Sequence, residues 1–123
     1  MGNILLSIGG FYCIAFFIFH LSFWKLFRWK TDLQRITPIN RAIIQVLNLR
    51  LTYVFLFVGI MLFLFQVELL ETKLGKFFLI AMSIFWFMRA IEQIIFFSRK
   101  KMVSWMMFVL FTIGGALFLI PAL

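Results

Sequence analysis

Four long apolar runs dominate the order of hydrophobic and polar positions along this chain. They cover roughly residues 3–26, 51–67, 77–97 and 102–119, and most charged residues gather between them. Each run meets or approaches the length of about 20 residues that a helix needs to cross the hydrocarbon core of a bilayer. No segment alternates apolar and polar residues over about ten positions, as the strands of a transmembrane β-barrel do. The pattern therefore predicts an all-α integral membrane protein, with four transmembrane helices in an antiparallel bundle joined by short loops.

The segment before the second run, residues 37–50, fits two structures. Thr37 followed by Pro38 is typical of an N-cap and a proline at the first helical position. Four polar residues then recur with spacings of 4, 3 and 4, which places them on one helical face: Arg41, Gln45, Asn48 and Thr52. They belong either to a separate amphipathic helix in the membrane interface or to the cytoplasmic end of one long second helix. Because no glycine or later proline interrupts this stretch, we favour a continuous helix over about residues 39–67.

Composition agrees with the membrane class. Of the 123 residues, 65% are hydrophobic and 13% are charged, whereas a soluble domain is about half apolar and about a quarter charged. The length predicts a single domain over residues 1–123. One cysteine, Cys13, excludes an internal disulfide and a cysteine-based metal site within one chain.

The positive charge is concentrated in two of the three loops. Eight lysines and arginines lie from the end of the first helix to the start of the second, or between the third and fourth: Lys25, Arg28, Lys30, Arg35, Arg41, Arg99, Lys100 and Lys101. The remaining loop holds Lys73 and Lys76, offset by Glu68 and Glu71. By the positive-inside rule both basic loops are cytoplasmic and both termini lie outside. We expect the inner membrane of a bacterium as the location.

Three tryptophans mark the same side of the predicted membrane. Trp24, Trp29 and Trp105 lie beside the basic loops, where aromatic belts form at the membrane–water interface. The net charge of +8 flanks apolar segments, which indicates orientation and contact with anionic lipids rather than nucleic-acid binding.

Seven polar residues are predicted to lie at a similar depth below the cytoplasmic surface. At about 1.5 Å per helical residue they fall about 8 to 15 Å inside. They come from three of the helices: His20, Gln45, Asn48, Arg50, Arg89, Glu92 and Gln93. The last three share one face at spacings i, i+3 and i+4. Because ionisable groups in hydrocarbon are costly, we expect these side chains to line a cytoplasm-side polar pocket.

The charges in this layer leave two interpretations open. Arg50 and Arg89 keep their charge on burial, and Glu92 can neutralise only one of them. The residues therefore form either a hydrogen-bonded knot, worth about 0.6 to 2 kcal/mol per contact, or a cavity for an anion, a lipid phosphate or a proton. His20 is the only histidine, and one histidine cannot supply both axial ligands of a haem in a monomer. We expect no metal and no cofactor.

Three functions fit, in decreasing order. No phosphate-binding glycine loop, HExxH motif or nucleophile elbow appears, which favours a non-catalytic protein. The first hypothesis is a subunit of a membrane complex or a carrier. A carrier would work as a homo-oligomer, because four short helices leave little room for a transport pathway within one copy. The second is a membrane enzyme or lipid-binding protein, in which Arg50 and Arg89 hold a phosphorylated headgroup and His20 and Glu92 act as acid and base. The third is a haem-binding electron-transfer subunit.

Two glycine pairs suggest where helices meet. Gly9 and Gly10 lie near the outer end of the first helix, and Gly114 and Gly115 near the outer end of the fourth. Small residues let membrane helices approach closely. We therefore expect the first and fourth helices to touch near the outer leaflet.

Overall fold

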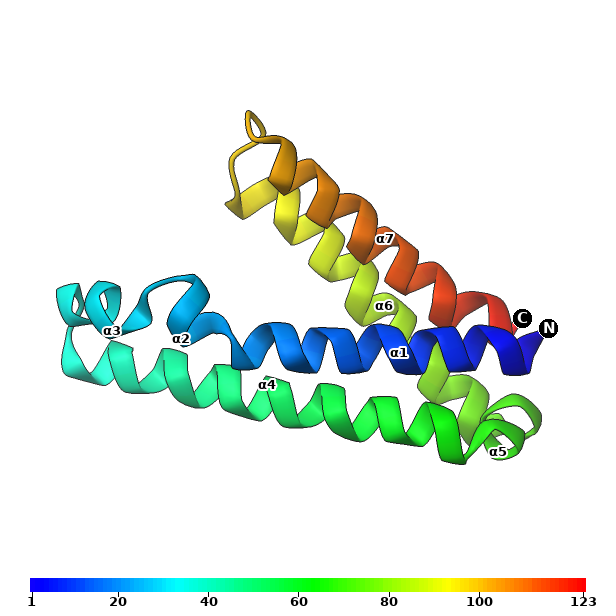
Figure 1. The fold of residues 1–123 in the computed structure, drawn as a ribbon. Coiled ribbons are helices and arrows are strands. Elements are labelled where there is room, and N and C mark those ends of the chain that lie inside the picture. Colours follow the sequence, from blue (N-terminus) through cyan, green and yellow to red (C-terminus); the bar gives the residue numbers. More distant parts are fainter. The chain divides into compact units, whose positions relative to one another are not determined.

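The computed structural model describes all 123 residues and contains helices only (Figure 1). The elements, in chain order, are α1 (Gly2–Leu21), α2 (Phe23–Leu26), α3 (Trp29–Asp32), the 3-10 turn η1 (Leu33–Arg35), α4 (Pro38–Leu64), α5 (Gln66–Glu71), α6 (Lys73–Phe96) and α7 (Met102–Ala122). Four of them, α1, α4, α6 and α7, are long and apolar enough to cross a membrane by length and composition. The predictions of an all-α fold and of four such helices are therefore confirmed. The antiparallel four-helix bundle stays a prediction.

The chain divides into two compact units, which are described separately. The α1–α4 unit comprises residues 10–61, and the α6–α7 unit comprises residues 1–9 together with 62–123. The first contains most of α1 and α4 and the short helices that connect them. The second contains α5, α6 and α7 with the first turns of α1 and the end of α4.

Helix α4 is one unbroken helix of 27 residues, as predicted for the continuous alternative. The Thr37 side-chain oxygen accepts a hydrogen bond from the backbone N–H of Asn40 at 3.4 Å, and Pro38 is the first helical residue. This is the N-cap and first-turn proline that the sequence indicates. The helix ends at Leu64, a few residues before the predicted end, because Phe65 leaves the helical conformation.

Helix α1 ends at Leu21, five residues earlier than predicted. The Ser22 hydroxyl donates to the carbonyl oxygen of Ile18 at 3.0 Å, a local bond that weakens helix continuation. Arg28 then adopts the left-handed conformation at φ 54° and ψ 43°, which turns the chain between α2 and α3. Three short helical segments thus connect α1 to α4 where the sequence suggested one longer first helix and a loop.

In the α1–α4 unit, α1 and α4 run side by side in opposite directions (Figure 1). Gly59 of α4 lies against Cys13, since a Cβ atom at Gly59 would be 3.3 Å from the Cβ of Cys13. Further along, the Phe16 and Phe55 rings pack with centroids 5.7 Å apart, and both side chains are buried. Residues later in α1 contact residues earlier in α4. The two helices therefore run in opposite directions.

In the α6–α7 unit, α6 and α7 form a helical hairpin (Figure 1). The Ser83 hydroxyl donates to the carbonyl oxygen of Gly115 at 2.9 Å, and the Gln93 amide donates to the Ser104 hydroxyl at 3.2 Å. A Cβ atom at Gly115 would lie 2.5 Å from a carbon of the Phe87 ring. The absence of a side chain at Gly115 therefore lets the two helices approach closely.

The short helix α5 packs against the start of α6. The Thr72 side chain caps α6 by accepting from the Gly75 N–H at 2.9 Å. A Cβ atom at Gly75 would overlap the backbone of Glu68 and Leu69. Gly75 is therefore the residue that allows α5 to fold back onto α6.

Gly9 and Gly115 each lie against a neighbour within their own unit, and a contact between α1 and α7 at the glycine pairs stays a prediction. A Cβ atom at Gly9 would meet Leu62 at 3.2 Å, and one at Gly115 would meet Phe87. The absence of a side chain lets α4 lie close to α1 at Gly9 and lets α6 lie close to α7 at Gly115.

Candidate functional site

The seven residues of the predicted polar pocket are divided between the two units. His20, Gln45, Asn48 and Arg50 belong to the α1–α4 unit, and Arg89, Glu92 and Gln93 belong to the α6–α7 unit. Each group has its own local geometry. A single pocket that combines them stays a prediction.

His20 and Asn48 join α1 to α4 by a reciprocal pair of hydrogen bonds. The Asn48 Nδ2 donates to the backbone carbonyl of His20 at 3.0 Å. The Asn48 Oδ1 therefore faces the imidazole, and His20 Nδ1 donates to it at 2.8 Å. Asn48 is 6% exposed, and Thr52 donates to its carbonyl oxygen at 2.6 Å. This part of the predicted pocket is a helix–helix fastening of the kind that the knot interpretation describes.

Gln45 lies nearer the start of α4 and contacts the tryptophan that follows α1. Trp24 Nε1 donates to Gln45 Oε1 at 2.9 Å, and Gln45 Nε2 donates to the Arg41 carbonyl at 3.2 Å. Both ends of the Gln45 amide are thereby satisfied, and its orientation is fixed.

Arg50 is exposed on an apolar surface of α4. Every stretch of 18 residues inside this 27-residue helix contains Arg50. Its neighbours along the helix include Leu47 and Tyr53, which are 64% and 60% exposed. Any membrane-spanning segment of α4 thus carries one positive charge on an outward surface.

Arg89 of α6 is held between aromatic rings. Its guanidinium carbon lies 4.4 Å from the centroid of the Phe111 ring and 5.3 Å from that of Phe97. Phe111 also stacks on Trp86, with centroids 5.9 Å apart and 19° between the planes. The cation is therefore half-buried against the faces of two phenylalanines, which attract it electrostatically.

Gln93 and Glu92 are consecutive but have different surroundings. Gln93 is 4% exposed and donates to Ser104 of α7. Glu92 is exposed. Helix α7 therefore covers the side of α6 that carries Arg89 and Gln93 and leaves Glu92 outside.

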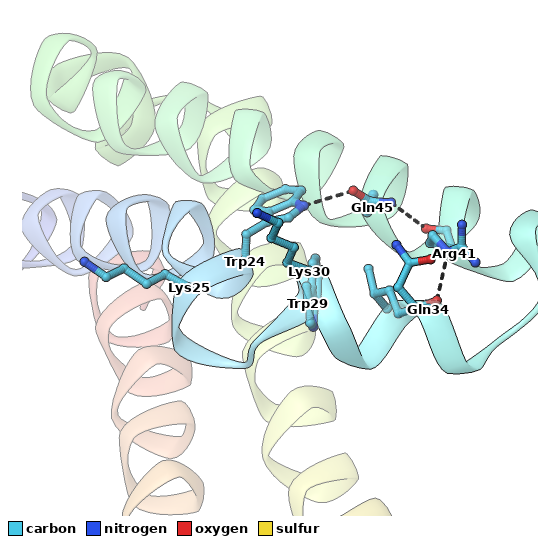
Figure 2. Close-up of a pocket in the computed structure, with 8 residues that line it drawn as sticks. Trp24, Lys25, Trp29, Lys30, Gln34, Arg41 and Gln45 are labelled. Atoms are coloured by element: carbon cyan, nitrogen blue, oxygen red, sulfur yellow. Dashed lines mark hydrogen bonds between the residues drawn. The ribbon is translucent and has the colours of Figure 1, made fainter.

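An open pocket of about 470 Å³ lies between the α2–η1 segment and the start of α4 (Figure 2). It is lined by Trp24, Lys25, Trp29, Lys30, Leu33, Gln34, Arg41 and Gln45. Only Gln45 belongs to the predicted site. The signal for the others was the cluster of basic residues and tryptophans after the first apolar run, a pattern that membrane orientation also explains.

The walls of this pocket are fixed by hydrogen bonds and ring contacts. Arg41 Nε donates to the Leu33 carbonyl at 2.8 Å, and its Nη2 donates to the Ile36 carbonyl at 3.4 Å. The rings of Trp24 and Trp29 meet edge to face, with centroids 5.1 Å apart. Figure 2 shows Arg41, Gln45 and Trp24 linked in a row, whereas Lys25 extends away from them. Arg41 is thus the anchored cation of the pocket.

No group of three or more histidine, cysteine, aspartate or glutamate side chains is placed to hold a metal ion. The chain matches no known protein family, no curated protein and no solved structure.

Proposed function

We propose that this chain is a non-catalytic integral membrane protein that works as a homo-oligomer, with its basic loops in the cytoplasm. Two features of the fold support this function. Four helices have the length and composition of membrane spans. Polar side chains within them are used to fasten helices together, as Asn48 fastens α4 to α1 and Gln93 fastens α6 to α7.

The exposure of Arg50 carries the proposal of an oligomer. Arg50 lies 12 residues after Pro38, about 18 Å along α4. An arginine stays charged in any environment, and a charge facing lipid tails is costly. In the membrane Arg50 therefore requires an acceptor from outside its own apolar surface.

A second copy of the chain offers a suitable acceptor. Glu92 is an exposed carboxylate, and it lies four residues before the end of α6. Arginine and carboxylate form paired hydrogen bonds of matched geometry. Glu92 already interacts electrostatically with Arg89 of its own helix. In the proposed assembly Arg50 of one copy pairs with Glu92 of another, and this pair removes the uncompensated charge of Arg50 from the lipid-facing surface.

Charge exchange tests this pairing. We expect single-molecule photobleaching of the labelled protein in lipid bilayers to show more than one copy per particle. Arg50→Glu and Glu92→Arg should each shift the population towards single copies. The double exchange should restore the assembly, because the pair is re-formed with reversed signs.

The matched control is Arg99→Glu, which makes the same change of charge in the loop between α6 and α7. It should leave the number of copies per particle unchanged. A native protein that is a single copy at every density would contradict the proposal. Single variants that assemble normally would contradict it as well. If Arg50→Lys behaves as the native protein while Glu92→Arg has no effect, Arg50 reaches lipid phosphates instead of a partner, because either side chain can extend to the membrane surface.

The orientation is part of the same proposal. Seven lysines and arginines lie in the α1–α4 and α6–α7 connections and an eighth, Arg41, lies in the first turn of α4, whereas only Lys73 and Lys76, in the first turn of α6, lie at the opposite end. This asymmetry supports cytoplasmic basic loops and external termini.

A further inference from the structure

The pocket between the α2–η1 segment and α4 has the chemistry of a headgroup site. Three of its eight lining residues are basic, Lys25, Lys30 and Arg41, and none is acidic. Asp32, the acidic residue of the same segment, is exposed and does not line the pocket. The formal charge of the lining residues is therefore positive, while most of the lining surface is apolar, which favours an anionic amphiphile over a cation.

Arg41 is positioned to act as the anion anchor. Its two hydrogen bonds to the carbonyls of Leu33 and Ile36 use Nε and one hydrogen of Nη2. A guanidinium has five N–H donors, so the remaining three are left for an acceptor with several oxygens. The side chain is half-buried and fixed in place, which lowers the entropy lost on binding.

The place of the pocket on the chain points to a lipid rather than a soluble anion. It follows directly after the apolar helix α1, at the beginning of α4. Two of its walls are Trp24 and Trp29, the residue type that concentrates at the headgroup level of membranes. Leu26 and Phe27, which follow Lys25 in the chain, are 55% and 47% exposed and provide apolar surface for acyl chains.

The size of the pocket suits a headgroup. Its volume of about 470 Å³ lies within the usual range of small-molecule sites, about 300 to 1,000 Å³. The pocket is open to the outside. A lipid can therefore place its phosphate inside while its tails stay in the bilayer.

We propose that this pocket binds an anionic phospholipid from the cytoplasmic leaflet, with Arg41 as the fixed cationic ligand of its phosphate. Lys30, whose amine lies beside Trp24 at the other end of the pocket (Figure 2), is the second cation that attracts the headgroup. The proposal rests on the membrane orientation of the proposed function and not on the oligomer. The tryptophans hold the lipid at the interface, and Gln45 keeps the Trp24 indole in place.

Native mass spectrometry of the purified full-length protein tests the site. The protein is titrated with a phosphatidylglycerol, with a phosphatidylcholine of the same chain length, and with inorganic phosphate as a competitor. We expect one phosphatidylglycerol to bind at least about tenfold more tightly than phosphatidylcholine. Lys30→Gln should lower this affinity about fivefold, which corresponds to the loss of one cationic contact of about 1 kcal/mol with an anionic lipid.

The variants separate the site from general surface charge and from loss of folding. Arg41→Gln should weaken binding further, but Arg41 also closes the turn before α4, so Lys30→Gln is the decisive variant. Arg99→Gln and Lys73→Gln remove exposed charges elsewhere and should leave the affinity unchanged.

Three outcomes would overturn the proposal. One is equal loss of affinity in all four variants, which would show nonspecific attraction. The second is equal binding of phosphatidylcholine. The third is displacement of the lipid by an equal concentration of inorganic phosphate, which would show a free-phosphate site. The same spectra report the number of copies, so a failure of the lipid site is distinguishable from a failure of the oligomer.

Discussion

Replacing Gly115 by alanine tests the close approach of α6 and α7. A Cβ atom at this position would lie 2.5 Å from Phe87 Cε1 and 2.6 Å from Cζ. Carbon atoms in ordinary contact are about 3.5 to 4.0 Å apart. The ring of Phe87 must therefore move by about 1 Å, or the two helices must separate and stretch the Ser83 hydrogen bond to the Gly115 carbonyl.

The expected loss of stability follows from two opposing terms. Overpacking of a filled site costs about 1 to 3 kcal/mol. Alanine in place of glycine favours the helix by up to about 1 kcal/mol. Three ring atoms of Phe87 lie within 2.7 Å of the added Cβ, which places this site in the upper half of the overpacking range, about 2 to 3 kcal/mol. After the gain in helix propensity we expect Gly115→Ala to destabilise the protein by about 1 to 2 kcal/mol.

Gly9→Ala is the matched control, because it makes the same change in another long apolar helix. Its Cβ would meet only Leu62 Cδ1, at 3.2 Å, and that methyl group ends a flexible side chain. Helix propensity then balances or outweighs the small overlap, and the stability should stay within about 0.5 kcal/mol of the native protein. Reversible unfolding in mixed micelles, followed by circular dichroism, measures both variants. If Gly115→Ala is as stable as Gly9→Ala, α7 does not pack on α6 with Gly115 against Phe87.

Three further variants test other parts of the structure in the same unfolding assay. Asn48→Leu removes both hydrogen bonds to His20 and should destabilise the protein by about 1 to 3 kcal/mol; an unchanged stability would show that the pair is not formed. Gly75→Ala places a Cβ atom against the backbone of Leu69 and should cost about 3 kcal/mol or more, because backbone cannot yield as a side chain does; a loss below about 1 kcal/mol would contradict the packing of α5. Arg28 has a left-handed conformation that costs an ordinary residue about 1 to 2 kcal/mol and costs glycine little. Arg28→Gly should therefore equal or exceed the native stability, despite the greater freedom of glycine in the unfolded chain. A clear loss of stability would show that the Arg28 side chain contributes to the fold.

The sequence predicts α4 well because every local signal there agrees. Thr37 and Pro38 start the helix, no breaker follows, and the polar positions recur at helical spacing. The structure confirms the start and the continuity. Helix α1 was predicted too long because its end depends on Ser22 bonding locally to Ile18 and on Arg28 in a left-handed conformation. Neither residue is a strong helix breaker by type.

The surroundings of Glu92 show the limit of spacing arguments. Arg89, Glu92 and Gln93 fall within one side of a helix, but at about 100° per residue Glu92 and Gln93 lie about 100° apart. Helix α7 covers Gln93 and leaves Glu92 exposed. Which part of that arc is covered depends on the neighbouring helix, and the sequence of α6 alone does not contain this information.

The basic pocket was missed for a similar reason. Lys25, Lys30 and Arg41 are explained by membrane orientation when they are read along the chain. Only the short helices α2, α3 and η1 bring them round a common space with two tryptophans. A charge cluster can serve orientation and binding at once, so a sequence pattern that orientation explains does not by itself point to a pocket.

Cysteine labelling in intact cells tests the central claim, that both basic loops lie on the cytoplasmic side of a membrane. In a Cys13→Ala background, single cysteines replace Thr31, Ser98 or Lys73, which are all exposed. A membrane-impermeant maleimide should label the cysteine at Lys73 in intact cells, and those at Thr31 and Ser98 only after the membrane is opened. Labelling of the Thr31 and Ser98 positions from opposite sides, or of all three from the same side, would contradict the account.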